Sequence, residues 1–443
     1  MEKFLSFTRS IIPRRLLLFL QPAYHLLLAA LAALYYGFPS RHLTVIGVTG
    51  TNGKTTVVHL LHEIFAAAGF KAGSLSSLRF KINNDETPNL LKMTMPGRLQ
   101  LQKFLAQCRA SSCRFVILEV TSEGIKQFRH RFIQFRAAVL TNVTPEHIES
   151  HGSFERYRDA KLELFRCLPP SGWAVLNRED ESAELFKRAT AAKIVWYSAS
   201  AIELERVGHP VHLLKVESSY ILADVDDAVI EAPLGGFFNA QNLLAAVAAA
   251  LAFQISLSAI AQAVHRFPGV PGRLEYVSRT PFAVVVDYAH TPDALEKVYQ
   301  VLQSARLPDG QAERKAQSGG LICVLGSAGG GRDKWKRPEL GRIISRYCQE
   351  IILTSEDPDE EDPDQIASAI QSGMPNDKIQ MPKVILDRRT AIREALRSAH
   401  SGDTVVITGM GAQPWFIEKG KKIPWDERRI VREELEKIQN KTD

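Results

Sequence analysis

Residues 43–69 read LTVIGVTGTNGKTTVVHLLHEIFAAAG, and this stretch decides the fold. An apolar strand leads into a glycine-rich turn and then an apolar helix, which is the order of parts in a phosphate-binding loop. Backbone N–H groups at the helix N-terminus hold phosphate oxygens, a lysine neutralises charge, and a hydroxyl reaches magnesium. The usual pattern GxxxxGK would place its first glycine at Val48, so this loop is a variant form. The parts expected to bind phosphate are Gly50, Gly53, Lys54 and Thr55.

Apolar runs and helical runs alternate on both sides of a Pro- and Gly-rich hinge, FPGVPGR, at 267–273. Strands separated by helices predict a parallel sheet that is covered on both faces. We therefore expect an α/β protein with a P-loop central domain, a mostly parallel sheet, and a C-terminal Rossmann-like α/β domain. The expected boundaries are 1–42 for an apolar N-terminal helical segment, 43–271 for the central ATP-binding domain and 272–443 for the C-terminal domain.

Composition narrows the class of protein. The chain has 443 residues, 45% of them hydrophobic, which fits a globular protein with ordinary cores. Its net charge of +6 comes from scattered Lys and Arg, which argues against a nucleic-acid-binding surface. The five cysteines form no CxxC pair and no zinc-like spacing, so we expect free thiols in a reducing compartment.

An apolar stretch at 16–37 carries no acidic or basic side chain apart from His25. Pro22 is expected to interrupt it, leaving a helix over 23–36 of about 21 Å at ~1.5 Å per residue. That length is short of a ~30 Å bilayer core. We expect residues 12–37 to contact a membrane surface or a partner, with packing onto the protein's own body as the open alternative.

The loop TGTNGKTT is written as in the Mur ligases, which join amino acids to peptidoglycan precursors. Further motifs follow in family order: LEVTSEGI, TNVTPEHIESHG, YRDAKLELF, FNAQN, PGRLE, VVVDYAHTPDAL, GSAGGGRDKWKRP and DRRTAI. The chain therefore resembles the Mur ligases from Leu43 to its C-terminus, and within them the MurE type. That resemblance implies a cytoplasmic enzyme of cell-wall synthesis that uses ATP and Mg²⁺ to activate a carboxylate as an acyl phosphate, which an amine then attacks.

The resemblance also implies roles for individual residues. Magnesium would be held by Thr55, Glu119, His147 and a carbamylated Lys161, and catalysis would depend on Lys54, Glu119, His147 and Lys161. ATP would contact Gly50, Thr51, Asn52, Gly53, Lys54, Thr55, Thr56, Asn142, Asn239, Asn242, Arg273, Asp287 and His290. The muramoyl peptide and the amino acid would contact Thr94, Ser122, Gln127, Arg129, Asp359 and Gln413.

Several departures from the family pattern leave the substrates open. The N-terminal domain that grips UDP in MurE is replaced by the short apolar segment. The motif DNPR, whose arginine binds diaminopimelate, reads EDPD with Asp359 in the arginine's place, and GKGHE reads GMGAQ with Gln413 in place of a glutamate. Glu123 likewise stands where the family motif EVSSHAL has a histidine. An acidic Asp359 predicts lysine or ornithine in preference to meso-diaminopimelate.

Three readings stay open from sequence. The leading one is a ligase acting on a UDP-N-acetylmuramoyl peptide. A second is a Mur-type ligase acting on a lipid-linked or polyglutamate substrate, and a third is a membrane-associated nucleotide-binding module without ligation. The oligomeric state is not predicted.

Overall fold

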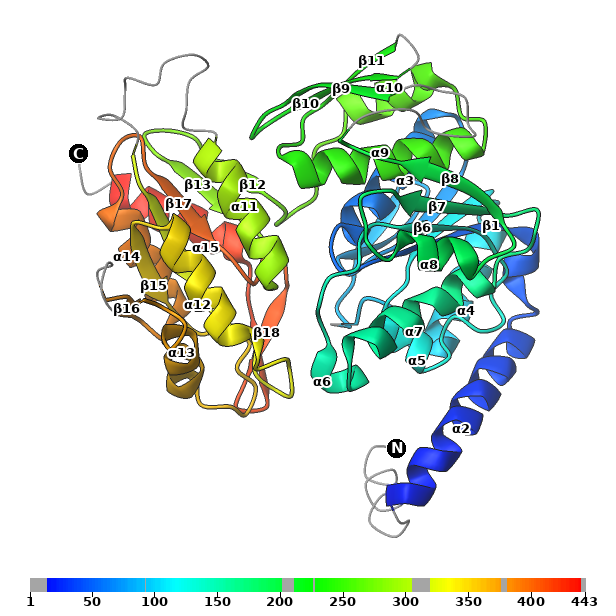
Figure 1. Cartoon of the computed structure of the whole chain (residues 1–443), viewed down its shortest axis with the longest axis horizontal. Coiled ribbons are helices and arrows are strands. Elements are labelled where there is room, and N and C mark those ends of the chain that lie inside the picture. The colour runs from blue at the N-terminus through cyan, green and yellow to red at the C-terminus, as the bar shows by residue number, and fades with distance from the viewer. Residues whose placement is uncertain are drawn as a thin grey trace.

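The computed structural model describes residues 14–91, 93–200, 211–225, 228–304, 319–375 and 381–439. Figure 1 shows two α/β units side by side, with a long helix that extends from one of them. The predicted fold class is confirmed, since each unit is built on a largely parallel sheet.

The first unit contains an eight-stranded sheet in the order β4-β3-β2-β5-β1-β6-β7-β8. Strands β2, β5, β1, β6, β7 and β8 are mutually parallel, while β3 and β4 form an antiparallel edge hairpin that sequence reasoning missed. The strands are β1 (Thr44–Thr49), β2 (Ala72–Leu75), β3 (Arg79–Ile82), β4 (Asp85–Pro88), β5 (Phe115–Glu119), β6 (Phe135–Leu140), β7 (Trp173–Asn177) and β8 (Lys193–Tyr197).

Helices cover both faces of this sheet because side chains alternate along each strand. Ile46 and Val48 of β1 join the core beneath α3, α9 and α10, whereas Val45 joins the core beneath α4, α7 and α8. The helices are α3 (Lys54–Ala67), α4 (Arg98–Ala110), α5 (Ser122–Lys126), α6 (Ile148–His151), α7 (Phe154–Arg166), α8 (Ala183–Arg188), α9 (Phe237–Ala252) and α10 (Leu257–His265). A small antiparallel sheet of β9 (Val211–Val216), β10 (Ile221–Val225) and β11 (Ala228–Ala232) lies beside α10.

The second unit has a six-stranded sheet in the order β12-β13-β17-β14-β15-β16, in which only the pairing of β12 with β13 is antiparallel. Its strands are β12 (Glu275–Ser278), β13 (Ala283–Val286), β14 (Leu321–Leu325), β15 (Glu350–Leu353), β16 (Lys383–Val384) and β17 (Thr404–Ile407), with a hairpin of β18 (Trp415–Glu418) and β19 (Lys421–Pro424). Its helices are α11 (Pro292–Ser304), α12 (Lys336–Tyr347), α13 (Pro363–Gln371), α14 (Arg388–Ser398) and α15 (Glu427–Gln439).

Two cysteines of the second unit are not free thiols, so the cysteine prediction was wrong for them. Cys323 on β14 and Cys348 after α12 form a disulfide with their Cα atoms 6.0 Å apart. Twenty-five positions separate them in sequence and only the fold brings them together, so local sequence spacing does not predict this disulfide. Cys108, Cys113 and Cys167 are free.

The N-terminal helix differs from prediction in its length. Helix α2 runs from Arg14 to Tyr35 through Pro22, which does not end it. A proline removes one N–H and crowds one carbonyl, and a helix exposed at that point has room to bend around it; residues 21–24 are exposed. The C-terminal half of α2 packs on α4, followed by a 3₁₀ turn (Pro39–His42), while the rest extends away from the body (Figure 1). No helix in the described part of the chain is long and apolar enough to cross a membrane.

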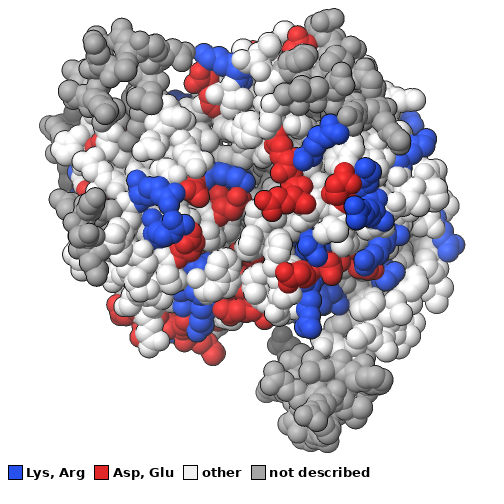
Figure 2. Space-filling view, in the orientation of Figure 1, with Lys and Arg blue, Asp and Glu red and all other residues white. Residues whose placement is uncertain are grey.

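Charges of both signs mix on the surface. Figure 2 shows Lys and Arg interspersed with Asp and Glu over the face it presents, without a broad area of one sign. Such a face does not have the continuous basic track that nucleic-acid backbones require.

Candidate active site

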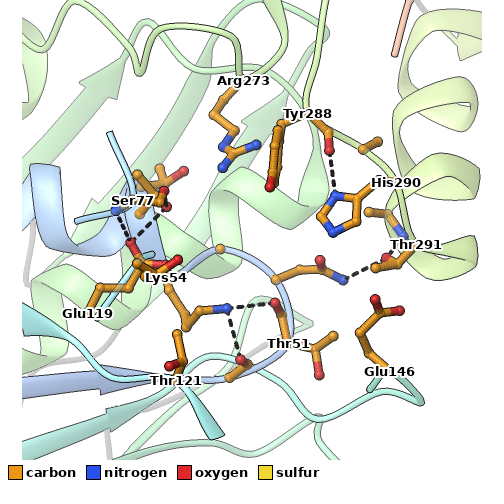
Figure 3. Close-up of a pocket in the computed structure, with 18 of the residues that line it drawn as sticks. Thr51, Lys54, Ser77, Glu119, Thr121, Glu146, Arg273, Tyr288, His290 and Thr291 are labelled. Atoms are coloured by element: carbon orange, nitrogen blue, oxygen red, sulfur yellow. Dashed lines mark hydrogen bonds between the residues drawn. The ribbon is translucent and has the colours of Figure 1, made fainter. Parts of the chain in front are cut away.

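A cavity of about 450 Å³ opens where the two units face each other. Its walls come from the phosphate loop after β1, the ends of β5 and β6, helices α7 and α9, and the segment from β13 to α11 of the second unit (Figure 3). Crevices outside the carboxyl ends of parallel strands are the usual ligand sites of open α/β sheets. Every sequence-predicted site residue lines this cavity except Asp359.

The phosphate loop closes around its own lysine. Lys54 Nζ donates to the carbonyl oxygens of Gly50 at 3.0 Å and Thr51 at 2.8 Å, and burial lowers the pKa of this lysine. Gly53 has φ 84°, and a Cβ there would lie 2.0 Å from Oδ1 of Asn242 on α9. The loop therefore needs glycine at this position both for its backbone and for the asparagine beside it.

A carboxylate and two hydroxyls meet at the start of α3. Thr55 Oγ1 donates to Glu119 Oε2 at 3.0 Å and lies 3.1 Å from Ser77 Oγ, while the Ser77 N–H donates to the same Glu119 oxygen at 3.0 Å (Figure 3). Magnesium binds proteins through one or two carboxylates together with water and substrate phosphates. This donor set fits that mode, and no ready-made cage of three His, Cys, Asp or Glu side chains exists among the described residues. Sequence reasoning missed Ser77, whose surroundings carry no phosphate-loop signature.

Lys161 of α7 is buried to 2% exposure under the loop. Its Nζ donates to Gly50 O at 2.9 Å and lies 4.3 Å from the ring centroid of Tyr157. Burial, and then the charge of Lys54, hold the pKa of Lys161 well below its usual value, which favours the neutral amine. Burial, and then nearby positive charges such as that of Arg332, lower the pKa of His147 to about 3, so its imidazole is neutral near pH 7.

The second unit supplies cationic and polar groups to the opposite wall. The Arg273 guanidinium lies 4.0 Å from the ring centroid of Tyr288, and Asp287 accepts from the Leu274 and Ala289 N–H groups. His290 Nδ1 lies 2.8 Å from Tyr288 O, and burial holds the pKa of His290 well below its usual value. These groups face the phosphate loop across the cavity (Figure 3).

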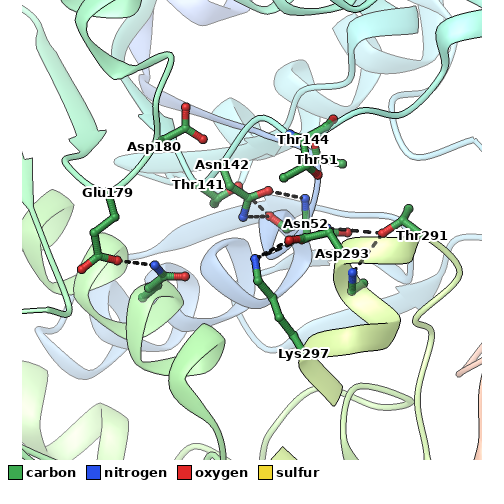
Figure 4. Close-up of polar contacts among 12 residues, drawn as sticks. Thr51, Asn52, Thr141, Asn142, Thr144, Glu179, Asp180, Thr291, Asp293 and Lys297 are labelled. Carbon is green, nitrogen blue, oxygen red and sulfur yellow. Dashed lines mark hydrogen bonds and ion pairs between the residues drawn. The ribbon is translucent and has the colours of Figure 1, made fainter. Parts of the chain in front are cut away.

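Direct hydrogen bonds join the loop to the second unit. Asn52 Nδ2 donates to Asp293 Oδ2 at 3.0 Å and to Thr291 Oγ1 at 3.5 Å, and Lys297 pairs with Asp293 at 2.8 Å (Figure 4). On the other side Asn142 Oδ1 accepts from the Asn52 N–H at 2.9 Å. Thr291, Asp293 and Lys297 were missed from sequence because DYAHTPDALEK carries no spacing that distinguishes a ligand residue from a helix cap.

Buried polar contacts also join the units near α6. Lys336 of α12 pairs with Glu146 at 3.1 Å, and Asp333 accepts from the Ile148 and Glu149 N–H groups at 3.3 and 3.0 Å. Both members of the Lys336–Glu146 pair are buried. Because a buried pair is costly to break, these contacts favour the arrangement in which the two walls of the cavity are close.

Thr94, Ser122, Gln127 and Arg129 line the part of the cavity that the first unit contributes. Ser122 Oγ lies 3.2 Å from His151 Nε2, which also lies 3.2 Å from Glu123. The hydrogen bond from His151 is the largest cause that lowers the pKa of Glu123 to about 2. Glu123, which replaces the family's histidine, is thus held by a histidine from another segment.

Asp359 is the one predicted site residue that does not line the cavity. Its backbone, at φ 58°, pairs with β18 through Ile417 O and the Lys419 N–H, and its Oδ2 lies 2.5 Å from where a Cβ on Gly330 would stand. Its carboxylate therefore lies beside Gly330, outside the lining of the cavity. Gln413 does line the cavity and donates to Tyr288 Oη at 2.9 Å.

Comparison with known proteins identifies the family. The Mur ligase middle domain model matches residues 48–250, and the Mur ligase glutamate ligase domain model matches residues 272–411. A UDP-N-acetylmuramoyl-L-alanyl-D-glutamate–2,6-diaminopimelate ligase of Gloeobacter violaceus is 40% identical over 418 residues, covering 92% of this chain and 80% of the relative. The same-named ligase of Syntrophomonas wolfei is 36% identical, covering 92% and 81%.

Solved structures agree with this assignment. A structure of UDP-N-acetylmuramoyl-L-alanyl-D-glutamate–2,6-diaminopimelate ligase superposes with a TM-score of 0.58 at 31% identity, covering 90% of this chain and 79% of that one. Mycobacterium tuberculosis folylpolyglutamate synthase complexed with ADP and AMPPCP has a TM-score of 0.68 at 18% identity, covering 87% and 92%, which shows the shared fold alone.

Proposed function

The chain belongs to the Mur ligase family, and we propose that it joins an amino acid to the free carboxylate of a UDP-N-acetylmuramoyl peptide while ATP is split to ADP and phosphate. One observation carries this proposal. A single cavity contains the phosphate loop, the Thr55–Glu119 donor pair, Arg273 from the other unit and the cluster around Arg129. A protein that only binds a nucleotide has no use for the last two groups.

The first step forms a bond between an acceptor carboxylate oxygen and the γ-phosphorus of ATP, and the bond from that phosphorus to ADP breaks. Negative charge gathers on the transferring phosphoryl group, so cations placed beforehand accelerate the step. Lys54 from the loop and Arg273 from the opposite wall are such cations. The closed arrangement of the units brings both to the same cavity.

In the second step the amine nitrogen attacks the acyl carbon, and phosphate leaves with the former carboxylate oxygen. The attacking ammonium must first lose a proton. The products are an amide, ADP and phosphate.

Bound Mg²⁺ would polarise the phosphates and neutralise their charge. We propose Thr55 and Glu119 as the ligands of one magnesium, with His147 and carbamylated Lys161 near a second. The carbamate forms from a neutral amine and CO₂ with release of a proton, and the low pKa of Lys161 supports this assignment. The product is an anion that supplies a carboxylate-like oxygen.

The two relatives compared in detail are named for 2,6-diaminopimelate, and we propose a diamino acid as the substrate. Asp359 lies outside the lining of the cavity, so its charge gives no reason to prefer lysine or ornithine over diaminopimelate. Gln413 and Arg332 line the cavity on the side of the second unit, and we propose that they bind the amino acid.

We also propose that α2 rests on the cytoplasmic surface of a membrane. Its large apolar side chains Tyr24, Leu27, Leu31 and Leu34 are 51–64% exposed. They recur at intervals of three and four residues, so they form one stripe along the helix. ATP for the reaction is available on the cytoplasmic side, which places the enzyme there.

The function is tested by phosphate release. The wild-type chain is mixed with ATP, Mg²⁺ and pairwise combinations of acceptor (UDP-linked or lipid-linked muramoyl dipeptide) and amino acid (meso-diaminopimelate, lysine, ornithine or alanine). We expect release only when an acceptor and a diamino acid are both present. Lys54→Ala, which removes the charge at the terminal phosphates, should release none. Release that is independent of acceptor would indicate a nucleotide hydrolase instead.

A further inference from the structure

Two guanidinium groups lie side by side at the acceptor end of the cavity without a carboxylate partner. Arg129 donates to Gln127 Oε1 at 2.8 Å and also to Met95 O, and Arg98 donates to Gln127 O. Among the described residues, no acidic oxygen lies within ion-pair distance of either arginine. Burial, and then the charge of Arg98, lower the pKa of Arg129, so the two positive charges act on each other.

Helix α2 of the N-terminal segment lies next to the two arginines. Helix α2 packs on α4, and the charges of Arg98 and Arg129 both act on its His25. The two ring nitrogens of His25 and the Nε atoms of Arg98 and Arg129 are buried without a hydrogen-bond partner. The two Nε–H groups and the one N–H of a neutral imidazole are donors without an acceptor, which is costly unless a ligand oxygen reaches them.

The backbone adds positive character at the same place. Helix α4 begins at Arg98, and its N-cap residue Gly97 provides no side-chain acceptor for the first N–H groups. Unsatisfied N–H groups and the helix dipole both favour an anion at such an end. The start of α4 and the two arginines together form a positively charged rim between α2 and α4. Such a rim suits a ligand with more than one negative charge.

The position of the cluster indicates which part of the acceptor it meets. The reacting carboxylate must lie by Lys54 and Glu119, whereas Arg129 lines the same cavity and Arg98 lies just beyond the lining. Helix α4, which begins at Arg98, lies with α2 on the side of the first unit away from the second unit (Figure 1). An acceptor with its carboxylate at the phosphate loop therefore leaves the cavity past these arginines. In a carrier-linked muramoyl peptide, the group at the end away from that carboxylate is a diphosphate.

We propose that Arg98, Arg129 and His25 bind the diphosphate of the acceptor's carrier at the rim between α2 and α4. The inference rests on the proposed function and adds a site to it. Paired guanidinium groups match adjacent phosphates through bidentate N–H···O bonds. A nucleoside diphosphate and a polyprenyl diphosphate present the same chemistry here, and the apolar face of α2 lies next to the rim.

The test compares acceptors with and without the diphosphate. Ligation by the full chain is measured with UDP-N-acetylmuramoyl dipeptide, with its polyprenyl-diphosphate counterpart, and with the N-acetylmuramoyl dipeptide that carries no phosphate. Arg98→Ala should raise KM for a diphosphate acceptor about tenfold, the loss of one charge-assisted contact, and leave the phosphate-free acceptor unchanged. Arg98→Lys should recover part of the loss. Arg109→Ala, an exposed arginine in the last turn of the same helix, is the matched control.

Arg98→Ala also removes the hydrogen bond from Arg98 to Gln127 O. A second variant therefore separates the loss of a phosphate contact from a change in local structure. His25 makes no hydrogen bond through its ring, so His25→Phe keeps the packing and should raise KM about threefold for diphosphate acceptors alone. The carrier is UDP or polyprenyl diphosphate, according to which of the two acceptors shows the rise in KM. An equal loss with and without the diphosphate, or no loss in either diphosphate arm, would overturn the site. Failure of wild type to ligate any acceptor would instead overturn the proposed function.

Discussion

At the scale of single residues, the most unusual group is the amine of Lys161. An ordinary lysine is charged and exposed, whereas this one is 2% exposed and lies beneath the phosphate loop. A charged ammonium would be repelled there by Lys54. The carbamate that we propose would carry a negative charge, which the cation of Lys54 and a magnesium held by Thr55 and Glu119 would stabilise.

We predict that Lys161→Ala loses most ligase activity, because it removes the carbamate oxygen. Formate or acetate at high concentration should restore part of the activity by filling the space with another carboxylate. The measurement is steady-state phosphate release with and without these anions, and Lys103→Ala on the exposed face of α4 is the control. Full turnover of Lys161→Ala without an additive would refute the carbamate.

Glu356 gives a prediction about pH and stability. It is 4% exposed against Gly326 and Gly409, and burial raises its pKa from 4.5 to about 7 despite the opposing charge of Arg388. A carboxyl group with a raised pKa contributes its full stability below the unfolded value of 4.5, and this contribution is lost as pH rises through about 7.

We therefore expect Glu356→Gln to raise the free energy of unfolding by up to about 3 kcal/mol at pH 8 and to change it little at pH 4.5. Urea unfolding at the two pH values is the measurement. Glu360→Gln, at an exposed position in the same loop, is the matched control and should show no such dependence. A variant that is destabilised equally at both pH values would show that Glu356 is ionised in the fold.

Sequence located most individual site residues because the motifs fix spacing as well as residue type. Lys54, Glu119, His147, Lys161 and Arg273 lie on different elements, yet all line one cavity. Asp359 lies outside the lining, and a motif comparison could not show this because it does not record where a loop turns its side chains. Ser77 and Arg98 were missed because neither stands in a motif, and their importance arises only from the neighbours that the fold provides.

At the scale of elements, α2 has apolar side chains on both faces. Ala29, Ala32 and Ala33 are buried against the body, while Leu27, Leu31 and other large side chains face outward. Exposed leucines in one stripe indicate an interaction surface. The sequence pattern predicted this helix and its exposure to a membrane or partner, but not that it would continue through Pro22, since a proline bends a helix as often as it ends one.

We predict that Leu27→Glu combined with Leu31→Glu abolishes association with anionic liposomes. Each change replaces buried hydrocarbon in the lipid interface with a charge that the surface repels. Co-sedimentation of the full chain is the measurement, and Leu185→Glu, an exposed leucine on α8, is the control. Equal partitioning of wild type and the double variant would remove the membrane proposal, and phosphate release should be unchanged with soluble acceptor.

Strand order shows the limit of sequence reasoning at this scale. Apolar runs predicted the buried parallel strands, because such strands read as continuous hydrophobic segments. The edge strands β3 and β4 and the small sheet from β9 to β11 have mixed, partly exposed side chains. Their pairing is fixed by contacts with neighbouring strands, which local periodicity does not record.

At the scale of the whole molecule, the site exists only where the two units meet. The phosphate loop belongs to one unit and Arg273, Asp287 and His290 to the other. The Asn52–Asp293 hydrogen bond and the Lys336–Glu146 pair join their surfaces. A ligase gains from this division, because a cavity completed only by closure excludes water from the acyl phosphate.

An acyl phosphate passes one oxygen atom of the acceptor carboxylate to the released phosphate, so isotope transfer reveals this intermediate. The acceptor is labelled with ¹⁸O in its reacting carboxylate and incubated with the wild-type chain, ATP, Mg²⁺ and a diamino acid, and the released phosphate is examined by mass spectrometry. We expect the phosphate to carry an ¹⁸O atom from the acceptor and its release to match amide formation. Phosphate free of ¹⁸O alongside amide formation would rule out the acyl phosphate.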